Sequence, residues 1–141
     1  MSMRATVLAA SLAAVVVVIV GALALRAWFE REPPPLDASG PGTALRLTPS
    51  SGAVPPPRFD VNLPGGARTS LAMAGIETGQ GRTVGQVSVF PAGAAPQRLD
   101  LAEGQSGQAG GLTVMVVHIW QMPDHANDAI DVRVVPATGG A

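Results

Sequence analysis

The sequence contains no cysteine, no lysine and no tyrosine, and only 4% of its residues are aromatic. Without cysteine, the chain cannot form a disulfide, a thiolate nucleophile, a cysteine zinc site, an iron–sulfur cluster or a lipoprotein anchor. Charged residues make up only 13% of the chain, about half the fraction of an ordinary soluble domain. The net charge of -1 also argues against a nucleic-acid partner, which requires a basic face. Much of the apolar content must therefore serve something other than an ordinary core.

One long uncharged run accounts for much of this apolar content. It extends from Ala5 to Leu25 and reads ATVLAASLAAVVVVIVGALAL. As a helix it would span about 31 Å, close to the thickness of the hydrocarbon core of a bilayer. Arg4 and Arg26 flank the run, and Trp28 follows at the position where aromatic side chains favour the membrane interface. Residues 1–29 are therefore predicted to form one transmembrane helix.

A cleavable signal peptide is the alternative for this run. Ala22-Leu23-Ala24 places small residues at the separation that signal peptidase recognises. The run is longer than a usual signal-peptide core, which favours a retained single-pass anchor. A short N-terminal tail before a folded domain places the C-terminal domain outside the cytoplasm, or secretes it if the peptide is cleaved. The excess of alanine, glycine, proline and arginine is typical of a GC-rich bacterial genome.

Residues 30–57 are rich in proline and glycine and hold eight of the thirteen prolines. Proline fixes φ and has no N–H to donate, so this segment cannot form a helix or a central strand. Pro33–Pro35 and Pro55–Pro57 are expected to be extended, and the segment is predicted to be a stiff linker. Within it, residues 43–48 alternate and predict a short edge strand.

The pattern changes to a period of two from Arg58 onwards. Apolar residues alternate with polar ones, or form short β-branched runs, in six segments: 58–63, 68–74, 83–90, 97–101, 111–122 and 129–135. Glycine or proline bounds most of them, as in turns between strands. Residues 58–141 are therefore predicted to form an all-β domain, a small antiparallel β-sandwich or barrel-like fold of six to seven strands.

The composition of these segments also predicts which side chains form the core. In residues 129–135 the apolar side chains are expected to point inward, and the charged Asp131 and Arg133 outward. Trp120 and Phe90 are expected to be the largest contributors to the core of this small domain.

The sequence contains no assembled catalytic motif. Ser106 lacks the G-x-S-x-G context of a nucleophile elbow. The glycines of residues 79–85 have the wrong spacing for a phosphate-binding loop and no lysine follows them. The chain is therefore predicted not to be an enzyme and to need no organic cofactor.

Both histidines of the chain fall in residues 118–131, HIWQMPDHANDAID. His118, Met122 and His125 are candidate ligands of copper, because imidazole and thioether groups suit Cu(I). The nearby acids could instead gather a hard cation such as calcium; they are Asp124, Asp128 and Asp131.

Strand geometry favours a simple loop over either metal site. His118 and Met122 would lie about 13 Å apart along one strand, whereas ligands of one ion lie within about 5 Å of each other. In the loop interpretation Pro123 ends the strand, and Asp124, Asn127 and Asp128 supply side chains that stabilise turns.

The sequence thus predicts a single-pass, membrane-anchored, non-enzymatic domain of a bacterial envelope that binds a protein partner or an envelope polymer. It could equally serve as an accessory subunit of a membrane complex. The alternative prediction is an extracytoplasmic copper-binding protein that uses His118, Met122 and His125.

Overall fold

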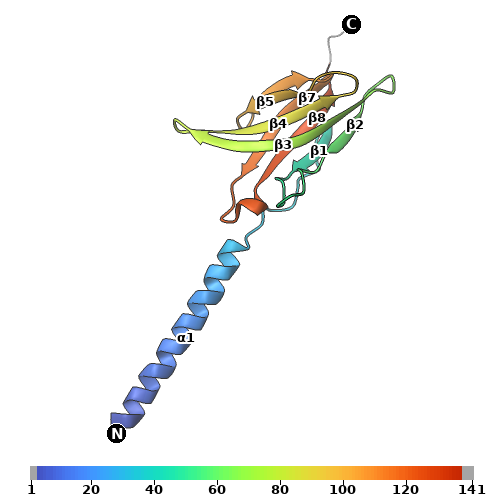
Figure 1. Ribbon diagram of the computed structural model, residues 1–141. Coiled ribbons are helices and arrows are strands. Elements are labelled where there is room, and N and C mark those ends of the chain that lie inside the picture. The colour runs from blue at the N-terminus through green and yellow to red at the C-terminus, as the bar shows by residue number, and fades with distance from the viewer. Residues whose placement is uncertain (1–2, 138–141) are drawn as a thin grey trace.

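The structure, a computed structural model, describes residues 3–137, which form one long helix followed by a domain of strands (Figure 1). Helix α1 spans Met3–Phe29, and none of its residues is buried. An 18-residue window of this helix has a mean hydropathy of 2.8, so the helix is long and apolar enough to cross a membrane. Arg26 lies in the last turn, where it complements the helix dipole and pairs with Glu30 at 2.9 Å. Pro33 follows shortly after and prevents the helix from continuing.

The strands form two four-stranded antiparallel sheets, as predicted for a sandwich. The first sheet has the order β1-β8-β7-β6 and the second has the order β2-β3-β4-β5. The strand bounds are β1 Thr43–Leu47, β2 Phe59–Asn62, β3 Arg68–Gly79, β4 Arg82–Pro91, β5 Gln97–Leu101, β6 Ser106–Ala109, β7 Leu112–Trp120 and β8 Ala129–Pro136. The expected short edge strand is confirmed as β1, so the sandwich begins within the segment that was predicted to be the linker.

Seven strands, β2–β8, lie in the predicted domain, in agreement with the expected six to seven, and β1 adds an eighth. The strand that the pattern missed is β6. Its sequence, SGQA, resembles a glycine-rich turn. Gly107 lies close to the second sheet, and a Cβ at this position would lie 3.2 Å from Leu99 Cδ2. The glycine therefore allows the two sheets to approach each other, and does not mark a turn.

The core between the sheets is aliphatic. Its fully buried side chains come from both sheets and are led by Leu47, Leu71, Leu112, Ile130, Val87, Val89, Val114, Val116, Val132 and Val134. Trp120 and Phe90 are only partly buried and lie outside this cluster, so the prediction that they dominate the core was wrong. Phe90 instead lies beneath the guanidinium of Arg58, 3.8 Å from the ring centroid.

A β-bulge explains the position of Trp120. The register of β7 against β8 shifts between Val116 and His118, which leaves Val117 as an extra residue. An extra residue exchanges the two faces of the strand from that point onwards. Ile119, opposite Ile130, therefore packs on the core, and Trp120 lies on the outer face.

The same valine-to-alanine change at one buried and one exposed position tests this assignment of the core. Val87 is completely buried, so we expect Val87→Ala to lower the free energy of unfolding by about 2 kcal/mol, from lost burial and the remaining cavity. Val54 is 63% exposed, and Val54→Ala should change stability by less than about 0.5 kcal/mol. Urea denaturation of both variants measures the difference; equal effects would contradict the core described above.

Candidate functional site

The outer face of the β1-β8-β7 sheet carries a buried carboxylate, Asp131. Its side chain points away from the core as predicted, yet the residue is only 5% exposed. Asp131 accepts hydrogen bonds from Arg46 Nε at 2.7 Å, from the Arg46 terminal nitrogen at 2.9 Å and from Trp120 Nε1 at 2.8 Å. Asp131 is buried although it points outward, because the side chains of two neighbouring strands and a segment of the linker cover it.

Strand register places Arg46, Asp131 and His118 side by side on the outer face. Arg46 on β1 lies directly opposite Asp131 on β8, and His118 on β7 is the partner of Asp131 on the other side. The hydrogen bonds to Asp131 raise the pKa of Arg46 above its ordinary value, and partial burial of the guanidinium opposes that rise. Arg46 therefore stays charged, and the group is suited to holding strands together, not to exchanging protons.

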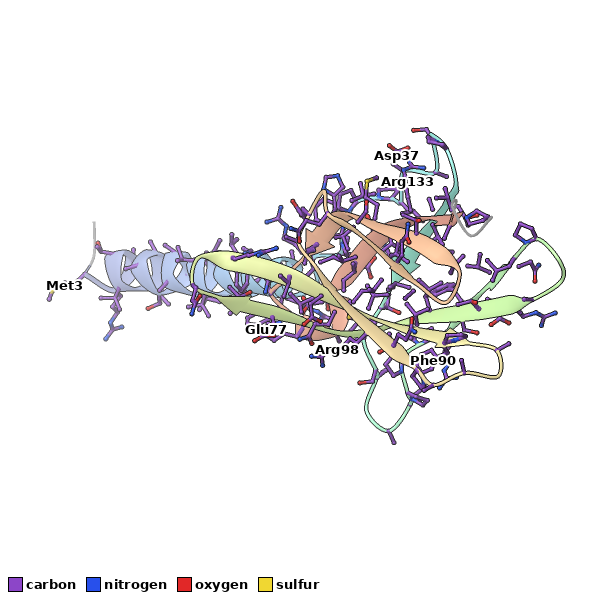
Figure 2. The ribbon with its side chains drawn as sticks, turned by 90° about the horizontal axis from the view of Figure 1, so that it is seen from above. Met3, Asp37, Glu77, Phe90, Arg98 and Arg133 are labelled. Atoms are coloured by element: carbon purple, nitrogen blue, oxygen red, sulfur yellow. The ribbon has the colours of Figure 1, made fainter. Side chains whose placement is uncertain are left out.

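A pocket of about 210 Å³ lies over this group, and we call it the outer-face pocket. Its lining combines a segment of the predicted linker with the outer face of the sheet, through Pro34, Leu36, His118, Trp120, Asp131 and Arg133. The rings of His118 and Trp120 are neighbours, with centroids 5.2 Å apart. Figure 2 shows Asp37 and Arg133 together on this side of the sandwich, and Phe90 and Arg98 on the opposite side.

Residues 31–41 lie against the sandwich and do not act as a free spacer. The Arg133 guanidinium donates hydrogen bonds to the carbonyl oxygens of Asp37, at 3.2 Å, Ser39 and Pro41, at 3.4 Å. At the other end, Asn127 Nδ2 donates to the carbonyl of Arg31 at 3.2 Å. Side chains of β8 and of the preceding loop therefore bind the main chain of this part of the proline-rich segment.

Asp37 stabilises a turn in this bound segment. Its carboxylate accepts hydrogen bonds from Ser39 Oγ at 2.6 Å and Ser39 N at 2.9 Å. The hydroxyl bond, then the amide bond, lower the pKa of Asp37 below its ordinary value of 3.8, and the charges of Arg133 and His118 act in the same direction.

A pH titration should reveal this turn. Since folding lowers the pKa of Asp37, its contribution is complete above pH 3.8 and is lost as the pH falls through the lowered value. We expect the Ser39 amide resonance in an NMR titration to shift with a midpoint below 3.8. Ser39→Ala should move the Asp37 midpoint upward; an unchanged midpoint would mean that the turn does not form.

The structure places the proposed copper ligands at separate positions. His118 lies on β7, with its Nδ1 4.0 Å from Glu103 Oε1. His125 begins the short 3₁₀ helix η1, His125–Asn127, and its Nδ1 lies 3.2 Å from Asp128 Oδ2. The backbone N–H of Met122 donates to the other oxygen of Asp128 at 2.7 Å. Met122 and His125 thus meet around Asp128, whereas His118 has a different carboxylate neighbour.

The acids of this loop perform the turn-stabilising role that the loop interpretation predicted. Asp124 caps η1 and accepts a hydrogen bond from Ala126 N at 3.0 Å. Asp128 binds Met122 N, whereas Asn127 uses its amide to hold the linker. Among residues 3–137, no group of three or more His, Asp or Glu side chains could hold a metal ion.

The copper hypothesis stays a prediction with a direct test. If His118, Met122 and His125 bind copper, adding the metal should raise the melting temperature, because a ligand of the folded state stabilises it. The double variant His118→Ala/His125→Ala should abolish that rise. A melting temperature that is the same with and without copper would rule the site out.

Sequence reasoning singled out His118 and Trp120 but missed Arg46 and Asp131 as their neighbours. A buried tryptophan usually needs an acceptor for its N–H, and this was the one available signal. Comparison with protein families, curated proteins and solved structures finds no match to this chain.

Proposed function

We propose that this protein is a membrane-anchored interaction domain of a bacterial envelope. α1 holds it in the membrane, and its sandwich is displayed outside the cytoplasm to bind a protein partner or an envelope polymer, as a non-enzymatic accessory. One observation carries the proposal: a helix with no buried residue, and with a mean hydropathy of 2.8 over an 18-residue window, is joined to a sandwich with its own aliphatic core.

The exposure of α1 supports an anchor over a structural helix. Its valine and leucine side chains have no protein surface to cover, with exposures of 51% at Val16 and 71% at Leu8. An apolar stretch of this length is costly in water, and lipid removes that cost. The sandwich needs no contact with α1 to bury its core, so it can work as a displayed module.

The polar groups of the sandwich support binding over catalysis. The ionised pair that is least exposed, Arg46 and Asp131, has its hydrogen bonds directed at each other and at Trp120. His118 and His125 each lie beside a carboxylate on the surface. These contacts fix strands and loops, as a recognition surface requires.

Topology mapping tests the location. Fusing alkaline phosphatase or a green fluorescent reporter after the sandwich should give phosphatase activity and no fluorescence, and the N-terminal sequence of the mature protein should begin before Ala5. The reverse reporter pattern would contradict the proposed location.

Affinity capture tests the role. The full-length protein, solubilised in mild detergent, should recover the same partner in repeated preparations. Removing residues 1–30 distinguishes the mode of binding: a partner held by the sandwich remains bound, whereas a partner held by α1 is lost. Repeated captures without a reproducible partner would contradict the proposal.

A further inference from the structure

An extended, proline-rich segment of the chain itself covers the outer-face pocket. Residues 34–37, PPLD, line the pocket together with His118 and Trp120 from β7 and with Arg133 from β8. The prolines keep this segment extended and prevent it from joining the sheet. Aromatic-lined surfaces that receive extended proline-rich segments are a recurring mode of peptide recognition. Here the aromatic-lined surface and the extended proline-rich segment belong to the same chain.

The polar contacts suit an extended ligand of a particular chemistry. Arg133 binds main-chain carbonyls of residues 37, 39 and 41, so these contacts do not depend on the side chains of the ligand. Arg133 donates a hydrogen bond to the carbonyl oxygen of Asp37 at 3.2 Å, so its positive charge lies close to this residue and attracts its carboxylate. The surface is therefore complementary to prolines followed by an acidic residue.

The bound segment fits its surface loosely. Pro34, Pro35 and Asp37 are exposed, and Leu36 is only half-buried. The space of about 210 Å³ around them is not filled by protein, so the segment leaves part of the apolar lining accessible to water. A segment attached to the same chain stays bound through its high effective concentration even when its contacts are weak. A ligand that fills the pocket better can therefore displace it.

We propose that the outer-face pocket is a recognition site for an extended segment of a partner protein, in which prolines precede an acidic residue. Residues 34–37 form one wall of this site in the free protein, and the partner displaces them. The inference rests on the proposed function as an interaction domain and names the class of partner. Only residues 30–33 separate this segment from α1, so displacement also frees the sandwich from its position near the end of the membrane helix.

The experiment measures peptide binding to the full-length protein in detergent micelles. The probe is a fluorescently labelled peptide with the sequence of residues 31–41, and binding is followed by fluorescence anisotropy. The release variant, Pro35→Gly/Leu36→Gly, weakens the intramolecular segment and leaves His118, Trp120 and Arg133 on the sheet side of the pocket unchanged. The matched control, Val54→Gly/Pro55→Gly, makes the same kind of change outside the pocket, where Val54 is 63% exposed.

We expect the release variant to bind the peptide at least about tenfold more tightly than the parental protein or the control, because its site is vacant more of the time. Adding His118→Ala should return binding to the control level, and so should a peptide in which alanine replaces Pro33, Pro34 and Pro35. His118 is exposed, so its replacement should leave the melting temperature unchanged.

Two results would overturn the proposal. The first is equal peptide binding by the release variant and the control, although faster protease cleavage of residues 31–41 in the release variant shows that this segment has been released. The second is a parental protein that light scattering shows to be a dimer and whose two copies exchange residues 31–41. A second copy of the chain would then be the occupant of the pocket. Neither result affects the topology and capture tests of the proposed function, and failure of those tests would leave the peptide-binding measurement interpretable.

Discussion

Replacing Val16 and Ile19 together with arginine is expected to remove the protein from the membrane fraction. Both residues lie in the middle of α1 and are about half exposed, at 51% and 52%. An arginine at the centre of a membrane helix costs about 2.5–3.5 kcal/mol on the insertion scale. Two of them cost about 5–7 kcal/mol, which corresponds to a roughly ten-thousandfold shift in partitioning. Extraction of membranes with alkaline carbonate, followed by immunoblotting of pellet and supernatant, measures the result.

The same variant also tests whether the sandwich is independent of α1. Since none of the residues of α1 is buried, we expect the β domain of the double-arginine variant to melt at the parental temperature. Val16→Leu/Ile19→Leu is the control, and it should remain in the membrane pellet. Recovery of the double-arginine variant in the carbonate-resistant pellet would show that α1 is not the anchor.

Replacing Asp131 with alanine is expected to lower the free energy of unfolding by about 3 kcal/mol, because it breaks the best-buried ion pair. Arg46 would keep its charge with its side chain only 21% exposed, and Trp120 Nε1 would lose its acceptor. In a domain of this size the melting temperature should fall by about 15 °C. Differential scanning calorimetry of the two proteins measures this fall.

An exposed pair provides the control for Asp131. Asp100 and Arg98 form an ion pair at 3.2 Å on the second sheet, with side chains 46% and 58% exposed. Surface pairs contribute about 0–1 kcal/mol, so Asp100→Ala should have little effect. Adding Arg46→Met to Asp131→Ala should restore part of the lost stability, since it removes the unpaired charge. Similar losses for Asp131→Ala and Asp100→Ala would contradict the role assigned to the outer-face group.

Most of the secondary structure was predictable because its signals are local. The apolar run that becomes α1 and the alternation that becomes β1–β5, β7 and β8 can each be read within one segment. β6 escaped because SGQA has no alternation of apolar and polar side chains, whereas Gly107 serves the close packing of the second sheet against it. Whether a glycine lies in a turn or under another sheet depends on residues distant in sequence.

The candidate site was much less predictable than the strands. Arg46 and Asp131 are 85 positions apart, and only the pairing of β1 with β8 places them opposite each other. His118 and Trp120 were noticed for other reasons, as a metal ligand and as a core residue. Their common position on the outer face follows from the bulge at Val117, which periodicity cannot reveal.

The sequence by itself determined that the chain would have one helix of membrane-spanning length followed by antiparallel strands, since helix length and side-chain period are properties of consecutive residues. Only the tertiary structure decided which face carries Trp120, that an outward carboxylate is buried, and that the proline-rich segment lies on the sheet. The physical reason is that one extra residue in a strand reverses its faces, and that the hydrogen-bond partners of Asp131 and Arg133 come from parts of the chain that meet only on folding.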